Sequence, residues 1–144
     1  MPNPRNHAAG GTADNRIYII GGRVGSVFIP NAFNIDLVEE YGPSKDQWQV
    51  RSPIPTPRSA AAWGCTRARF MWRGGEIRHR DYWATYTAVE SFDPKSDTWT
   101  RHAPMPMPRH GLAGDFVNNH FHLVKWIGAV RHKCAGAGDG YRSA

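Results

Sequence analysis

Arginines that follow a short proline-rich phrase are the residues of this sequence best suited to bind a charged ligand. Three copies of the phrase end at Arg5, Arg58 and Arg109, spaced 53 and 51 residues apart. A guanidinium group pairs with a carboxylate through two parallel hydrogen bonds, so these arginines could hold an acidic ligand. They could equally pack or hydrogen-bond around the turn, and the sequence leaves both roles open.

More candidate binding residues occur in segments 23–36 and 76–87, which are predicted as long loops. Loops on a rigid scaffold are where binding function concentrates. The second segment combines arginine with tyrosine and tryptophan, the residue types that dominate the energetics of protein interfaces. The candidates in the two segments are Arg23, Arg78, Arg80, Tyr82 and Trp83.

No pattern in the sequence predicts catalysis. It contains no HExxH motif, nucleophile elbow or Cys–His signature. Glu39 and Glu90 recur at the repeat spacing, which indicates a structural role in each repeat rather than a catalytic pair. His120 and His122 alternate along an expected strand, but a metal site needs further convergent ligands. We therefore predict a protein that is not an enzyme and has no catalytic residue, metal site or cofactor.

The composition indicates a globular, basic chain of 144 residues with a net charge of +6. The excess charge belongs to two patches, residues 67–80 and 125–144, in which the repeat pattern fails, so nucleic-acid binding is not expected. No apolar run is long enough to cross a membrane, and no signal peptide is visible. The default expectation is a cytoplasmic protein, although a missing N-terminus would hide a secretion signal.

The residues between successive arginines predict a unit of four short strands. Residues 8–13 are small and suit a crowded inner strand, and residues 17–20 form an apolar run that ends at the glycine pair 21–22. Such a pair permits positive φ and ends a strand. Residues 37–41 and 48–51 are predicted as the third and fourth strands, and the prolines that follow end the fourth.

The same pattern returns one repeat later and then fails. Residues 63–73 make a poor second strand, with Arg73 where the first unit has Ile20. After Val124 the glycine pair is missing. The aromatic residue two positions before a proline, and the tryptophan that follows it in the first two units, do not return at the expected spacing. The positions that match between the first two units, and are predicted as structural, are Gly21, Gly22, Gly74, Gly75, Tyr41, Phe92, Trp48 and Trp99.

This order of apolar strand, glycine pair, long loop, aromatic before proline, tryptophan and Pro-Arg phrase resembles the Kelch repeat. The resemblance covers residues 1–124 in about two and a half repeats, and it implies an all-β, Kelch-type β-propeller fragment of four-stranded antiparallel blades. An unrelated β-sandwich with chance periodicity is the alternative. The repeat boundaries fall near 5–57, 58–108 and 109–124, and residues 125–144 form an off-pattern, basic tail rich in glycine and alanine.

Two and a half blades cannot close a ring of the usual four to eight blades. The segment is therefore expected to need further blades or self-association to complete a propeller. The first phrase starting at Met1, the poor second strand and a tail without strand signal all favour a fragment. We expect the tail, and residues 63–73 with it, to be degenerate or frame-altered sequence.

Antiparallel order in such a blade, with strands a to d numbered from the axis outward, places the b–c loops and the d–a connections on one face. The loops 23–36 and 76–87 and the Pro-Arg arginines should therefore share a rim. In Kelch proteins that recognise peptides, this face resembles an arginine-lined cup, which implies a binding module for a protein or peptide. The alternatives are a remnant of a larger secreted carbohydrate-active or galactose-oxidase-like propeller, and a truncated product without independent function.

Overall fold

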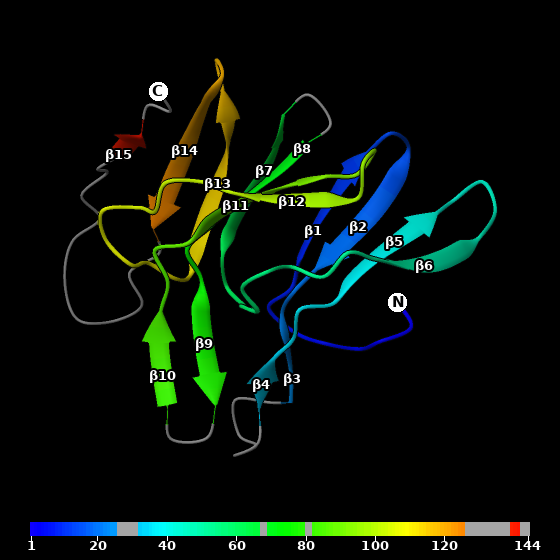
Figure 1. Ribbon diagram of the computed structural model, residues 1–144, viewed down its shortest axis with the longest axis horizontal. Coiled ribbons are helices and arrows are strands. Elements are labelled where there is room, and N and C mark those ends of the chain that lie inside the picture. Colours follow the sequence, from blue (N-terminus) through cyan, green and yellow to red (C-terminus); the bar gives the residue numbers. More distant parts are fainter. Residues whose placement is uncertain (26–31, 67–68, 80–81, 126–138, 142–144) are drawn as a thin grey trace.

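The computed structural model describes residues 1–25, 32–66, 69–79, 82–125 and 139–141. Within these ranges every regular element is a β-strand, and all the strand pairs are antiparallel (Figure 1). The all-β class and the antiparallel blades predicted from the sequence are confirmed.

The first blade is a four-stranded sheet in the order β1-β2-β5-β6. The turn between its first two strands holds Asp14 and Asn15 at φ values of 48° and 57°. Two successive residues with positive φ make the tight hairpin turn that matches strand twist, and Asp and Asn are residue types that tolerate it. The strands are β1 (Ala9–Ala13), β2 (Arg16–Ile20), β5 (Val38–Gly42) and β6 (Gln47–Arg51).

The second blade repeats this order with β7 innermost, and it corrects one expectation. Residues 63–73 do not make a poor strand, because β7 and β8 pair in continuous register. Phe70 and Trp72 are buried against the first blade, while the guanidinium of Arg73 lies 4.7 Å above the ring of Phe121 in the next sheet. The strands are β7 (Ala62–Thr66), β8 (Arg69–Arg73), β11 (Val89–Asp93) and β12 (Thr98–Arg101).

The third sheet contains three strands within the described residues: β13 (Leu112–Val117), β14 (His120–Lys125) and β15 (Asp139–Tyr141). The tail was expected to lack strands, but β15 pairs with β14 inside it. Val117 and Val124 are more than half exposed, since no described blade covers the far side of this sheet. The inner strands β1, β7 and β13 lie side by side, with β7 in the middle.

Both predicted long loops contain β-hairpins. The first hairpin pairs β3 (Arg23–Val24) with β4 (Phe33–Asn34), and the second pairs β9 (Glu76–His79) with β10 (Tyr82–Thr85). The two hairpins are neighbours, because β4 contacts β9. Figure 1 shows both projecting from the same side of the blades, at the bottom of the view.

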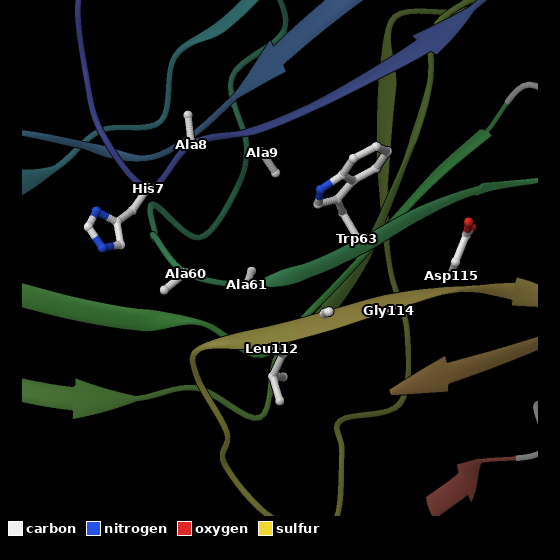
Figure 2. Close-up of a pocket in the computed structure, with 10 residues that line it drawn as sticks. His7, Ala8, Ala9, Ala60, Ala61, Trp63, Leu112, Gly114 and Asp115 are labelled. Carbon is white, nitrogen blue, oxygen red and sulfur yellow. The ribbon is translucent and has the colours of Figure 1, made fainter. Parts of the chain in front are cut away.

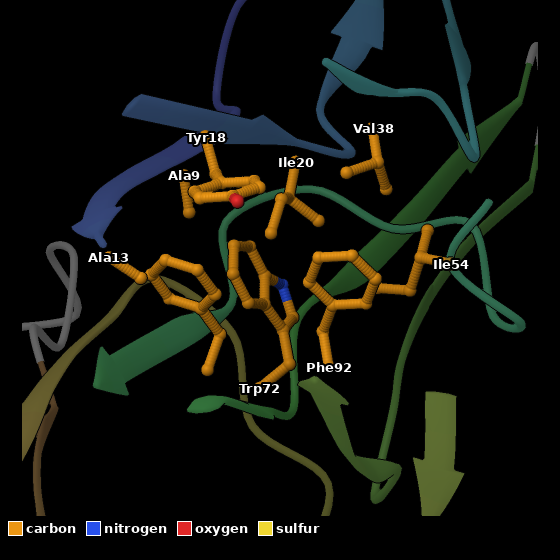
Figure 3. Packing of buried hydrophobic residues seen from close by; sticks show 9 residues of the cluster. Ala9, Ala13, Tyr18, Ile20, Val38, Ile54, Trp72 and Phe92 are labelled. Carbon is orange, nitrogen blue, oxygen red and sulfur yellow. The ribbon is translucent and has the colours of Figure 1, made fainter. Parts of the chain in front are cut away.

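The core between the first two blades is built from aromatic and branched side chains (Figure 3). Tyr18, Ile20 and Val38 from the first blade face Trp72 and Phe92 from the second. The ring of Tyr18 lies 6.0 Å from that of Phe92, centroid to centroid, in an edge-to-face arrangement. Burying each such side chain stabilises the fold by about 2 to 3 kcal/mol. This core fixes the two blades against each other and so fixes the hairpins that they carry.

The two glycine pairs complete the link between repeats. Gly22 has a φ of 95° and Gly75 a φ of 101°, a region that other residues rarely adopt. The N–H of Gly22 donates to the carbonyl of Arg58 at 3.0 Å, and the N–H of Gly75 donates to the carbonyl of Arg109 at 2.8 Å. Each glycine pair therefore joins the end of its strand to the Pro-Arg phrase of the next repeat.

Candidate binding face

The structure brings the Pro-Arg connections and the two hairpins together on one rim. Asn6 bridges to Arg23, and Ser59 bridges to Glu76, so the residue after each Pro-Arg phrase pairs with the start of a hairpin. These bridges hold the hairpins at their bases, and strands β9 and β10 extend beyond the blades (Figure 1). The rim thus joins the Pro-Arg connections to both hairpins.

Arg5 and Arg58 do not reach this surface with their side chains. Their guanidinium groups are fully buried and form ion pairs with Glu39 and Glu90, respectively. Burial lowers the pKa of Arg58, although the carboxylate of Glu90 acts in the opposite direction. Of the two roles that the sequence left open for Arg58, the structure places it in packing and hydrogen bonding around the turn, where it also donates to the carbonyl of Thr56 at 3.1 Å.

Arg23 is also buried, and it forms an ion pair across the boundary between the blades. Its Nη1 lies 2.7 Å from Oε1 of Glu76, and its Nε donates to Oδ1 of Asn6 at 2.9 Å. Its Nη2 lies within 3.2 Å of both ring nitrogens of His7. Burial and the charge of Arg23 lower the pKa of His7, in that order of size, which favours the neutral imidazole. Arg23 therefore supports the rim from inside.

Large side chains on the hairpins are exposed. Trp83 is 64% exposed, Tyr82 is 60% exposed, and Phe33 on the neighbouring hairpin is 49% exposed. Trp83 is nevertheless fixed, because its indole N–H donates to Oε2 of Glu76 at 3.0 Å. Nδ1 of His110 lies 2.9 Å from the same oxygen. An exposed ring with a fixed orientation is a suitable anchor for a partner.

The remaining predicted binding residues lie around this site to different extents. Arg109 is half-buried beside the second hairpin, and its main-chain N–H donates to the carbonyl of Tyr86 at 3.3 Å. Arg78 belongs to β9 by its backbone, and the position of its side chain is outside the described part. Arg80 also lies outside the described residues. Of the seven predicted residues, the structure therefore places Tyr82 and Trp83 on the surface, and Arg109 partly so.

Glu76 and His110 are functional candidates that sequence reasoning missed. Glu76 follows its glycine pair directly, as Arg23 follows the pair of the first repeat. Arg23 and Glu76 thus occupy equivalent positions in adjacent repeats and carry opposite charges, which indicates an ion pair between the blades. His110 follows Arg109 directly, but nothing in its spacing pointed to a partner in the hairpin.

A cavity of about 370 Å³ lies between the inner strands of the three sheets (Figure 2). Its lining is mostly main chain and methyl groups, with Trp63 as the one large aromatic side chain in it. His7 and Asp115 lie at opposite ends of the lining in this view, so they do not form a pair for acid–base chemistry. The full lining comprises His7, Ala8, Ala9, Ala60, Ala61, Trp63, Leu112, Ala113, Gly114 and Asp115.

Metal-ligating side chains do not converge anywhere in the described residues, where no group of three or more His, Cys, Asp or Glu could hold an ion. In the same part of the chain, no helix is long and apolar enough to cross a membrane.

Repeated four-stranded antiparallel sheets with adjacent inner strands are blades of a β-propeller. The solved structure of YjhT, a Kelch propeller, matches 85% of this chain and 34% of that chain, with a TM-score of 0.69 and 19% sequence identity. At that identity the likeness concerns the fold alone. The family model of the Kelch motif matches residues 4–55, which supports a partial set of Kelch repeats in this chain.

Curated relatives carry the same repeats. Kelch-like protein terF of Aspergillus terreus is 30% identical over 112 residues, which cover 77% of this chain and 24% of that protein. Kelch-like protein 26 of Danio rerio is 32% identical over 97 residues, which cover 67% and 15%. Beta-scruin of Limulus polyphemus is 30% identical, with coverage of 76% and 12%. The chain thus spans a quarter or less of these relatives, whose names are not those of enzymes.

Proposed function

We propose that this chain supplies a binding surface for a protein or peptide, formed by the two hairpins and the adjoining Pro-Arg connections. The exposure of Trp83 and Tyr82 carries the proposal, because other large aromatic rings, such as those of Tyr18, Phe70 and Phe92, are buried between blades. Exposed aromatic patches on a rigid scaffold mark interaction sites. Kelch propellers are generally protein-interaction modules, which supports the same function.

The residues of this surface have two kinds of role in the proposal. Trp83 and Tyr82 contact the partner directly, and Arg109 offers positive charge to a carboxylate. Arg78 and Arg80, in the segment 76–87, add further positive charge by sequence. Arg23 and Arg58 act indirectly, since their ion pairs hold the connections on which the contacting residues stand. The positive charge favours a partner with acidic groups near an apolar side chain.

Selection from a random peptide library displayed on phage tests the proposal. The purified chain is first examined by light scattering, because a defined particle shows that the blades form a working module. Peptides selected on the unaltered chain should bind Trp83→Ala about tenfold or more weakly, as expected for an interface anchor. Val50→Ala, which removes an exposed apolar side chain from the outer strand β6, is the matched control and should bind normally.

Two results would contradict the proposal. Peptides that bind Trp83→Ala and Tyr82→Ala as well as the unaltered chain would place the binding surface elsewhere. Aggregated or unfolded material would instead support the truncated product without independent function that the sequence left as an alternative.

A further inference from the structure

Glu76 is the residue through which the exposed part of the rim is joined to its interior. Its side chain is almost fully buried, yet it contacts two groups that reach the surface, the exposed Trp83 and the partly exposed His110. The indole N–H of Trp83 and Nδ1 of His110 lie 3.0 Å and 2.9 Å from Oε2 of Glu76, respectively. One carboxylate oxygen therefore fixes two side chains from different segments of the chain.

The other oxygen of Glu76 anchors the group to the first blade. Oε1 accepts from Nη1 of Arg23 at 2.7 Å, and the main chain of Glu76 exchanges hydrogen bonds of 2.8 and 3.1 Å with that of Ser59. The amide of Asn34 donates to the carbonyl of Glu76. Because Glu76 is held by its main chain and by an arginine, its second oxygen is a fixed reference point for Trp83 and His110.

This arrangement decides which atoms of the two rings remain for a ligand. In its neutral form, the imidazole of His110 carries its proton on the Nδ1 that faces the carboxylate, and its Nε2 then holds a lone pair directed away from Glu76. Trp83 uses its only polar atom on Glu76, which leaves the faces of its ring. The two rings meet edge to face, with centroids 5.5 Å apart at 72°, and form a corner.

We propose that Glu76 is a positioning residue that presents Trp83 and His110 to a ligand as one prearranged corner. The ring of Trp83 stacks on a flat apolar side chain of the bound peptide, and Nε2 of His110 accepts a hydrogen bond from a neighbouring N–H or O–H of the same peptide. Prearranged groups lose less conformational entropy on binding. The proposal rests on the proposed function, which places a peptide on this rim.

Glu76→Gln is the variant that tests this role. An amide keeps the size of the side chain but places N–H donors where a carboxylate accepted hydrogen bonds, so it cannot accept from Arg23, Trp83 and His110 at once. The matched controls are Glu39→Gln and Glu90→Gln, because these two residues are equally buried in ion pairs with arginine but lie within blades. Nitrogen NMR reports the tautomer of His110 and the indole signal of Trp83 in each variant.

In Glu76→Gln we expect the proton of His110 to leave Nδ1, the indole signal of Trp83 to shift, and the selected peptides to bind about fivefold or more weakly, as for a lost hydrogen bond. The control variants should lose stability but leave both signals in place. If Glu76→Gln does not fold, Trp83→Phe serves instead. It keeps an aromatic ring but removes the bond to Glu76 together with one ring of the indole, and it should bind the peptides several-fold more weakly.

Unchanged signals in Glu76→Gln, or full peptide binding by Trp83→Phe, would overturn the positioning role while leaving peptide binding on the rim intact. Shifted signals in a protein from which no peptide can be selected would instead overturn the proposed function, and with it the ligand contacts of the corner. The spectroscopic and binding arms therefore separate the two failures.

Discussion

The first and second blades carry matching aromatic–tryptophan pairs in nearly the same geometry, but they have different neighbours. The rings of Tyr41 and Trp48 pack with centroids 5.0 Å apart and planes tilted by 34°, and those of Phe92 and Trp99 pack at 5.0 Å and 32°. Within the described residues, the second blade has a sheet on either side, whereas the first has one on a single side. The repeat signature thus specifies the interior of a blade, and the neighbours decide how much each residue contributes to stability.

On the rim, in contrast, equivalent positions of the two repeats carry different residue types. The position after the glycine pair is Arg23 in the first repeat and Glu76 in the second, and these two residues pair with each other. At this position, a difference between the repeats joins two blades. Substitutions at matched positions of the two blades measure this difference.

The largest effect is expected from the buried ion pairs. Arg58→Ala removes the buried guanidinium that pairs with Glu90 and leaves this carboxylate with the exposed Arg101, 3.6 Å away, which should lower the free energy of unfolding by about 3 to 5 kcal/mol. Arg5→Ala should cost a similar amount, because the side chains of Arg5 and Glu39 are equally inaccessible. Chemical denaturation followed by circular dichroism measures both. A much smaller loss for Arg5→Ala would show that the uncovered side of the first blade admits water.

The two tryptophans should differ clearly. Trp99 packs against the first blade and donates its indole N–H to the carbonyl of Ser52 at 2.9 Å, so Trp99→Ala should cost about 3 kcal/mol. Trp48→Ala should cost about 1 kcal/mol, since the described residues provide no blade on its outer side. Thermal unfolding of the two variants makes the comparison. Equal losses would mean that contacts within a blade, rather than between blades, set the contribution of this position.

The second glycine of each pair should be equally intolerant of a side chain. A Cβ at Gly75 would lie 2.8 Å from the carbonyl oxygen of Ser59, and one at Gly22 would lie 2.8 Å from that of Asn6. Together with the positive φ, this should make Gly75→Ala and Gly22→Ala each cost about 2 to 3 kcal/mol. Denaturation midpoints test the pair, and a tolerated alanine at either site would contradict the rim junction described for that repeat.

A smaller effect of opposite sign is expected where the repeats share a left-handed residue. Ala60 has a φ of 51° and the equivalent Gly111 a φ of 60°. Ala60→Gly removes the strain of a left-handed alanine but adds disorder to the unfolded chain, so it should stabilise the protein by about 0.5 kcal/mol. Thermal unfolding detects this change, and a destabilised variant would contradict the strain.

The smallest effect is expected on the pH dependence of stability. It distinguishes the first repeat from the second, because His7 occupies the position that Ala60 has in the second repeat. Burial lowers the pKa of His7 below its ordinary value of 6.5, so the folded protein binds this proton less readily than the unfolded chain. The contribution of neutral His7 to stability is therefore complete above pH 6.5 and is lost as pH falls below it. His7→Asn, which tolerates the φ of 52°, should weaken this dependence in denaturation curves recorded on either side of that pH. An unchanged pH dependence of stability in His7→Asn would contradict this contribution of His7.

The blades could be predicted because their signature is local and repeated. The glycine pairs, the aromatic–tryptophan pairs and the recurring Arg and Glu positions all follow one period, and the fold follows from them. The burial of Arg58 was harder to predict, because a sequence does not distinguish a guanidinium paired with Glu90 inside a blade from one directed at a ligand. Comparing recurrences would have helped, because the arginine and the glutamate recur together.

The rest could not be predicted because it depends on contacts between repeats. Arg73 seemed to break its strand, yet the ring of Phe121, 48 residues later, receives its charge. Glu76 and His110 have no counterpart of the same type in the first repeat, so no recurrence of residue type marks them. Arg80 and the loop residues 26–31 lie outside the described residues, and their predicted part in binding stays a prediction.

The hydrogen bond from Gly22 to the carbonyl of Arg58, repeated from Gly75 to Arg109, has a consequence for how such chains change in length. Each repeat supplies a donor whose acceptor lies in the following repeat, so a single repeat leaves this peptide N–H to water. Gain or loss of a whole repeat preserves every donor with its acceptor. Gain or loss of part of one does not, and a gene built from these units is therefore expected to grow and shrink in whole steps.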